Sequence, residues 1–186
     1  MAVDIPELDA GTPFILRKRW FPMVITSPAT LYIVLLNAAS HYAAITHTHN
    51  DPKIQRILLD LRHAALAAIN VLIRSVPPNG HMPDTVIGAV AKMASYESMF
   101  GSGTLYRTHM RGLQHMVNQR GGLTKLGLDG LLGRMVQWID INSAFILGEH
   151  TFFTPSQPLA GHTGWDEVGT AVQPNPVAFL AVFGIY

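Results

Sequence analysis

The chain has 186 residues, of which 13 are basic and 12 acidic, and this near balance excludes a strong electrostatic field that would attract nucleic acid or an anionic membrane. It has no cysteine, which excludes disulfides and cysteine-ligated zinc and fits a reducing compartment. The length suits a single domain with a sizeable core, and 48% hydrophobic against 13% charged residues indicates apolar surface for a partner.

Residues 1–19 are expected to form an extended lead-in, because prolines and a glycine interrupt them. They end in a small basic cluster, Arg17 to Arg19, which we interpret as solvated charge rather than an import signal. The acidic N-terminus lacks the pattern of a secretory signal. The most apolar run, Leu31 to Ile45, is short and interrupted by polar residues, which favours a buried helix over a membrane span. The sequence therefore predicts no membrane segment.

The first two predicted helices each begin with a capping residue followed by proline. Ser27 supplies a hydroxyl cap for a helix that runs to about Thr46. Asp51 supplies a carboxylate cap for a second helix that runs to about Ser75. This second helix is amphipathic, and the prolines and glycine of residues 77–80 stop it.

The next two predicted helices are separated by the glycines of residues 101–103. The third runs from Asp84 to Phe100, and the fourth contains Tyr106 and ends at Gly121 and Gly122. A glycine there can adopt the left-handed conformation that satisfies the last carbonyls of a helix. The predicted core side of the fourth helix consists of Tyr106, Met110, Leu113 and Val117.

The fifth predicted helix, from an N-cap at Asp129 to about Leu147, is apolar around most of its circumference and includes Trp138. Only a narrow wet strip with Gln137 and Asp140 interrupts it. Such a helix is normally the central one of a bundle. We therefore expect Gly121, Gly122 and Trp138 to be structural residues.

These elements predict an all-α fold, a bundle of about five helices with an irregular, Pro/Gly-rich C-terminal tail. Its parts are a lead-in (1–19), a helical regulatory-type domain (20–153) and the tail (154–186). Prolines and glycines in the tail exclude long regular elements, and its apolar end is too short to span a bilayer.

The stretch HMRGLQHMVNQRGGLTKLGLDGLLGRMVQWID, from His109 to Asp140, resembles the regulatory region of fungus-specific transcription factors. The WFP of residues 20–22 and the ASHY of residues 39–42 add to the likeness, which covers roughly Trp20 to Phe153 and is expected to stop at the tail. In that family DNA is bound by a six-cysteine binuclear zinc cluster, which a chain without cysteine cannot hold. The resemblance implies a helical regulatory and interaction domain in the nucleus, as a shortened piece of such a regulator.

The partners implied are a protein or a second copy of the chain, with a small-molecule effector left open and no direct nucleic-acid binding. Arg107, Arg111 and His115 follow an i, i+4, i+8 ridge that suits an acidic partner or phosphate, although an ordinary solvated face is the commoner explanation. His47 and His49 next to Asp51 have metal-ligand chemistry, but a polar loop explains them better, so we predict no metal site.

The alternative is a small helical enzyme or ligand carrier in the cytoplasm. Its pocket would lie between the helix of Leu31 and the helix of Leu131, with His41, Tyr96 and Asp140 converging on it. No nucleophile elbow occurs, and the glycine clusters lack the setting of a phosphate loop. We therefore assign no catalytic or cofactor-binding residue.

Overall fold

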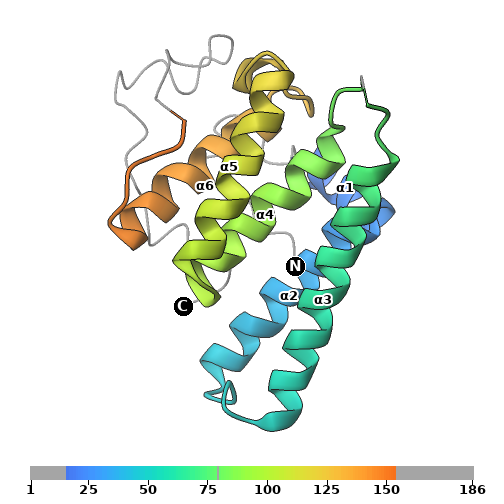
Figure 1. Cartoon of the computed structure of the whole chain (residues 1–186). Coiled ribbons are helices and arrows are strands. Elements are labelled where there is room, and N and C mark those ends of the chain that lie inside the picture. Colours follow the sequence, from blue (N-terminus) through green and yellow to red (C-terminus); the bar gives the residue numbers. More distant parts are fainter. Residues whose placement is uncertain (1–15, 79, 154–186) are drawn as a thin grey trace.

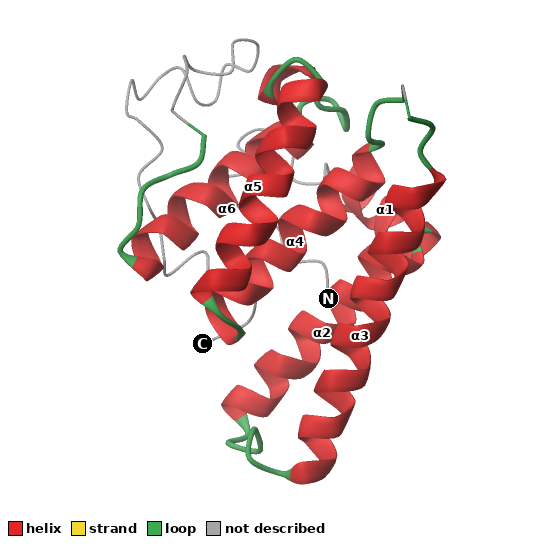
Figure 2. Cartoon of the chain, viewed as in Figure 1, coloured by secondary structure: helices red, strands yellow, loops and turns green. Residues whose placement is uncertain are grey.

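The computed structural model describes residues 16–78 and 80–153, and within these ranges it contains helices and no strand (Figure 2). The all-α prediction is thereby confirmed. In chain order the elements are the π-helical turn η1 (Leu16–Trp20), α1 (Phe21–Thr26), α2 (Pro28–Ile45), α3 (Pro52–Ser75), α4 (Asp84–Phe100), α5 (Gly103–Gln119), the 3-10 turn η2 (Leu123–Lys125) and α6 (Leu131–Leu147). The predicted irregular tail lies outside the described residues.

The start of the described chain differs from the sequence prediction. The lead-in that we expected to be extended is helical from Leu16 onward, and α1 follows directly. The described residues therefore contain six α-helices, where about five were predicted. The sequence hid α1 because Pro22 resembles a helix breaker, whereas proline in the first turn lacks only an N–H that has no helical partner there. Residues 1–15 lie outside the described part.

The three predicted caps have different outcomes. The Asp51 carboxylate accepts the Lys53 N–H at 2.8 Å, as predicted. Ser27 occupies the cap position of α2, but its hydroxyl makes no cap hydrogen bond. Asp129 is not the cap of α6, because the backbone turns through positive φ at Asp129 (56°) and Gly130 (80°) and the helix begins after the glycine.

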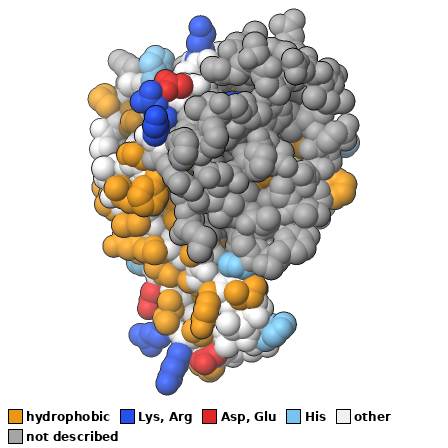
Figure 3. Space-filling view, turned by 180° about the vertical axis from the view of Figure 1, so that it is seen from behind, with side chains coloured by type: hydrophobic (Ala, Val, Ile, Leu, Met, Phe, Trp, Pro, Cys, Tyr) orange, Lys and Arg blue, Asp and Glu red, His pale blue; other side chains and the backbone are white. Residues whose placement is uncertain are grey.

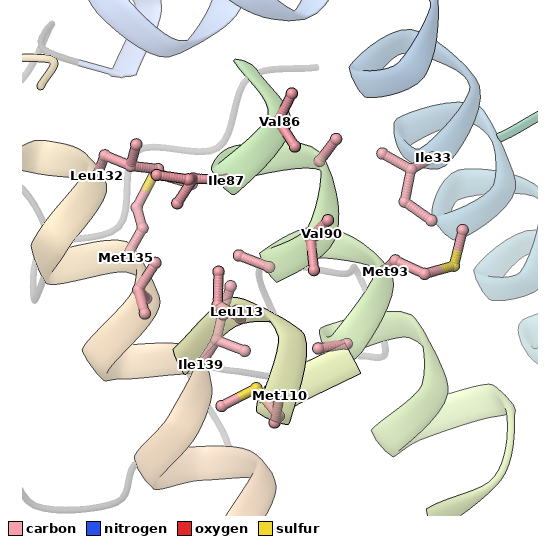
Figure 4. Close-up of a cluster of buried hydrophobic side chains, with 14 of the residues drawn as sticks. Ile33, Val86, Ile87, Val90, Met93, Met110, Leu113, Leu132, Met135 and Ile139 are labelled. Carbon is pink, nitrogen blue, oxygen red and sulfur yellow. The ribbon is translucent and has the colours of Figure 1, made fainter. Parts of the chain in front are cut away.

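The central helix is α4 and not α6, which corrects the sequence prediction. Every residue from Val86 to Ser98 is buried, and α4 packs against α2, α3, α5 and α6 (Figure 1). In Figure 4, Met93 lies toward Ile33 of α2, and Ile87 toward Leu132 of α6. Because Lys92 and Glu97 are charged, the sequence of α4 suggested a partly solvent-exposed helix, and its central position was not predicted.

The N-terminal helices form an arm beside this core. α2 and α3 pack against each other, and the end of the pair near the loop of residues 46–51 extends beyond the other helices (Figure 1). α1 joins α2 at a sharp bend, and its Met23 lies against Gly88 of α4, together with Trp20. A Cβ at Gly88 would stand 2.9 Å from atoms of both side chains, so glycine is needed for this close approach.

Candidate interaction surface

The fourth predicted helix, α5, presents one face to the core and one to solvent. Tyr106, Met110, Leu113 and Val117 are buried, which confirms the predicted core side. At its end, the Gly122 N–H donates to the Val117 carbonyl at 2.9 Å and the Gly121 N–H to the Asn118 carbonyl at 3.0 Å. Both Gly121 (φ 87°) and Gly122 (φ 102°) have positive φ, which confirms that the helix ends at the double glycine.

The predicted ridge lies on α5, and its three members have different environments. Arg111 and His115 are exposed. Arg107 instead forms an ion pair of 2.6 Å with Glu149 and donates to the Thr104 hydroxyl at 3.1 Å. The charge of Arg107 is therefore neutralised within the chain, and Arg111 and His115 form the part of the ridge that is open to a partner.

Glu149 belongs to a segment, residues 148–153, that runs back against α5 after α6 has ended; we name it the strap. The Gln114 side-chain amide donates to the Phe152 carbonyl at 2.7 Å. The Phe152 ring meets Tyr106 edge to face, with centroids 6.0 Å apart. The sequence pattern did not reveal the strap, because its hydrogen bonds with α5 join residues that are 38 or more positions apart.

Asp140 fixes the other side of the strap. Its two carboxylate oxygens accept the N–H groups of Phe152 (3.0 Å) and Phe153 (2.8 Å). Its side chain lies in the core, and burial raises its pKa to about 6, although the two amide donors act in the opposite direction. Burial also raises the pKa of the neighbouring Tyr106 phenol, and the Asp140 charge adds to this. Asp140 thus has a structural role that explains its place in an apolar helix.

A second buried polar cluster joins α3, α4 and α5. Arg62 forms an ion pair of 2.5 Å with Glu97, whose side chain is fully buried. The other Glu97 oxygen accepts the N–H of Ser102, the residue before α5, at 3.1 Å. The Arg62 guanidinium also lies 5.8 Å from the centre of the Tyr96 ring. Burial lowers the pKa of His109 on α5, while the Glu97 charge opposes that shift. The cluster therefore fixes the positions of α3, α4 and α5 relative to one another.

The residues proposed for the alternative pocket do not converge. α4 lies between α2 and α6 and packs against both, in the space where that pocket was expected. Tyr96 lies near Phe100, Arg62 of α3 and Ser40 of α2, whereas Asp140 on α6 holds the strap. His41 is on α2.

The described residues contain neither a metal-binding cluster nor a single helix that could span a membrane. Within residues 16–78 and 80–153, no group of three or more His, Cys, Asp or Glu side chains is placed to hold a metal ion. No single helix of the described chain is long and apolar enough to cross a membrane. One pair of consecutive helices, Lys18–Thr26 and Pro28–Ile45, has the combined length and composition of a membrane span, but the two helices are bent by 103° relative to each other.

The fold and its polar contacts define a helical domain whose buried charges serve its own packing. The family described as the fungal-specific transcription factor domain matches residues 12–185, and the chain belongs to this family. The match includes the tail, so the expectation that the likeness stops at Phe153 was wrong. No curated protein and no solved structure matches the chain.

Proposed function

We propose that this chain is a regulatory domain that acts in the nucleus through contacts with protein, without contacting DNA itself. The observation that carries the proposal is the family match, which spans nearly the whole chain. The packing supports it, because the buried carboxylates Glu97 and Asp140 are bound to an arginine and to backbone amides. Groups engaged in this way hold a scaffold together.

The distribution of cationic groups supports the proposed absence of DNA contact. Affinity for DNA grows with the number of phosphates that basic side chains neutralise together. Four arginines instead pair with carboxylates of this chain: Arg19 with Asp129, Arg62 with Glu97, Arg107 with Glu149 and Arg120 with Asp84. With a net charge of +1, the chain offers only small groups of cations to phosphate.

The partner surface that we propose is the open part of the α5 ridge, Arg111 and His115. These two side chains stand one helical turn apart on the exposed face. A guanidinium can bind a carboxylate with two parallel hydrogen bonds, so an acidic segment of another protein suits this surface. Arg107 supports the surface from within by holding the strap through Glu149.

A tethering assay tests this function. The chain is fused to an unrelated DNA-binding domain in a fungal reporter strain, where we expect it to change reporter expression relative to that domain alone. Arg111→Glu should remove most of the effect, because it reverses the charge presented to an acidic partner. Arg56→Glu is the matched control, since Arg56 is an exposed arginine on α3. A fused chain that leaves expression unchanged contradicts the regulatory function.

A DNA titration tests the second part of the proposal. Purified chain is titrated into labelled duplex DNA at several salt concentrations. We expect binding weaker than the roughly micromolar to 100 micromolar range of non-specific binders at physiological salt, and it should vanish as salt rises. Sequence-selective binding in the nanomolar range, without added metal or partner, would show that the chain contacts DNA directly.

A further inference from the structure

One helix of the arm is apolar on the face that points away from the core. The buried face of α2 includes Ile33, Leu36 and Ala43. Its exposed residues are all apolar or aromatic, and they are Pro28, Leu31, Tyr32, Leu35, Ala38, Tyr42 and Ile45. Tyr42 is 59% exposed and Ile45 52%. The buried face also carries the polar residues Thr30, Asn37 and Ser40, so the exposed face is the more apolar side of α2. A contiguous exposed apolar face of this kind marks an interaction surface.

The exposed face has the spacing of a helix–helix seam. Leu31, Leu35, Ala38, Tyr42 and Ile45 follow one another at intervals of four, three, four and three residues. This is the a/d pattern with which two helices pack side by side. The pattern nearly reads the same in both directions from Ala38, since Leu31 and Ile45 are each seven residues away and Leu35 and Tyr42 are three and four away.

We infer that this face binds a second copy of the chain, with the two α2 helices antiparallel about a twofold axis at Ala38. In a twofold interface, a contact between residue i of one copy and residue j of the other is repeated between residue j of the first copy and residue i of the second. Leu31 of one copy then meets Ile45 of the other, and Leu35 meets Tyr42. The small Ala38 side chains face each other at the axis, where they let the helices approach closely.

Charge and area favour a second copy over other occupants. α2 contains no Lys, Arg, Asp or Glu, so two copies do not repel each other there and an acidic or basic partner finds no opposite charge. A membrane-surface helix would carry Lys or Arg on its polar side, which α2 lacks. With Phe21 and Ile25 of α1, the exposed side chains offer on the order of 600 Å² per copy, close to the ~800 Å² per partner of a standard interface. Figure 3 shows hydrophobic side chains gathered along this arm.

Sedimentation of the full chain over a range of micromolar concentrations tests the inference. We expect the mass to rise from 20.4 kDa toward twice that value as concentration increases. Leu35→Glu should weaken association by more than about tenfold, because it places two carboxylates in an apolar seam. Val71→Glu is the control, since Val71 is 67% exposed but lies on α3, and it should associate like the unmodified chain. A clean monomer at every concentration overturns the inference.

Cysteine cross-linking tests the arrangement even if Leu35→Glu fails to fold. The natural chain has no cysteine, so each introduced thiol is unique. Ala38→Cys should form a linked dimer on oxidation or with a short thiol cross-linker, whereas Ala67→Cys on the exposed side of α3 should not. In a mixture, Leu31→Cys should link to Ile45→Cys more than to itself. Equal linking by Ala38→Cys and Ala67→Cys, or Leu31→Cys linking mainly to itself, overturns the arrangement.

The inference names one partner for the proposed interaction domain, and the two can fail separately. A monomer that still changes reporter expression contradicts only the dimer. A dimer without a reporter effect contradicts only the regulatory function.

Discussion

The core and the arm differ in where they place charged and apolar side chains. The core consists of α4, α5, α6 and the strap, and the arm consists of α1, α2 and α3. The core contains charged groups, Glu97 and Asp140, and surrounds them with matching donors. The arm exposes apolar side chains, including Leu59 on α3 (63%) and Tyr42 on α2 (59%). Buried polar groups need partners inside the chain, whereas exposed apolar groups await partners outside it. The buried charges of the core are therefore satisfied within the chain, by donors that include Arg62 of the arm, whereas the apolar face of α2 in the arm is suited to a second copy of the chain.

The largest expected effect breaks the charged contact between arm and core. Arg62→Ala leaves the Glu97 carboxylate without its cation in a fully buried position, and removing one partner of such a pair costs about 3–5 kcal/mol of unfolding free energy. Arg19→Ala is the control, because Arg19 and Asp129 are both more than half exposed. It should cost at most about 1 kcal/mol. Equal losses in urea denaturation would show that Glu97 is not desolvated.

A second variant tests how tightly the core is packed. A Cβ at Gly133 of α6 would stand 2.4 Å from the Leu123 carbonyl oxygen, so Gly133→Ala should destabilise by about 1–3 kcal/mol. Gly112 on α5 has no atom within 4 Å of such a Cβ. Gly112→Ala should therefore stabilise by up to about 1 kcal/mol, as alanine does in a helix. Two changes of the same sign would contradict the close contact of η2 with α6.

A third variant tests the end of α5, which positions the turn between α5 and α6. Gly121→Val puts a β-branched residue at a φ of 87°, and the strain should cost about 1–3 kcal/mol. Gly121→Asn should cost less, because asparagine tolerates the left-handed region. Thermal melting measures both. If valine and asparagine lower the melting temperature equally, the loss does not come from the backbone angle.

A fourth variant tests the pH dependence of stability that Asp140 should produce. Burial raises its folded pKa to about 6 from 3.8, so the folded chain holds a proton that the unfolded chain has released between these values. The contribution of Asp140 to stability therefore grows as pH falls from 6 toward 3.8 and is lost again as pH rises through 6. Asp140→Asn should remove this component from denaturation curves measured across that range, while Asp129→Asn should keep it. A profile unchanged in Asp140→Asn contradicts the burial of an ionisable carboxyl.

Local features of the sequence predicted the helix ends well. The cap at Asp51, the double glycine after α5 and the core side of α5 depend on residues within one or two turns, so composition and spacing suffice to find them. The cap at Asp129 failed because Leu128, Asp129 and Gly130 all adopt positive φ. Two non-glycine residues in that region are uncommon, and propensity alone does not anticipate them.

Long-range features could not be predicted in the same way. Arg62 and Glu97 are 35 positions apart, and the pairing depends on how α3 and α4 pack. The role of α4 was missed for a related reason, since a buried charge makes a central helix look amphipathic. For the candidate surface, the sequence found the ridge but not the strap, so it gave no sign that Glu149 would neutralise Arg107.

Hydrogen exchange, resolved by residue and measured at low and high protein concentration, tests the contrast between arm and core most directly. We predict that amides of α4 exchange most slowly and at the same rate at both concentrations, because the helix is buried within one chain. Amides of α2 should exchange faster at low concentration and become slower as concentration rises, because a second copy covers them. Two results would contradict the account. One is an exchange rate of the α2 amides that does not depend on protein concentration, and the other is exchange of the α4 amides as fast as that of the exposed end of α3.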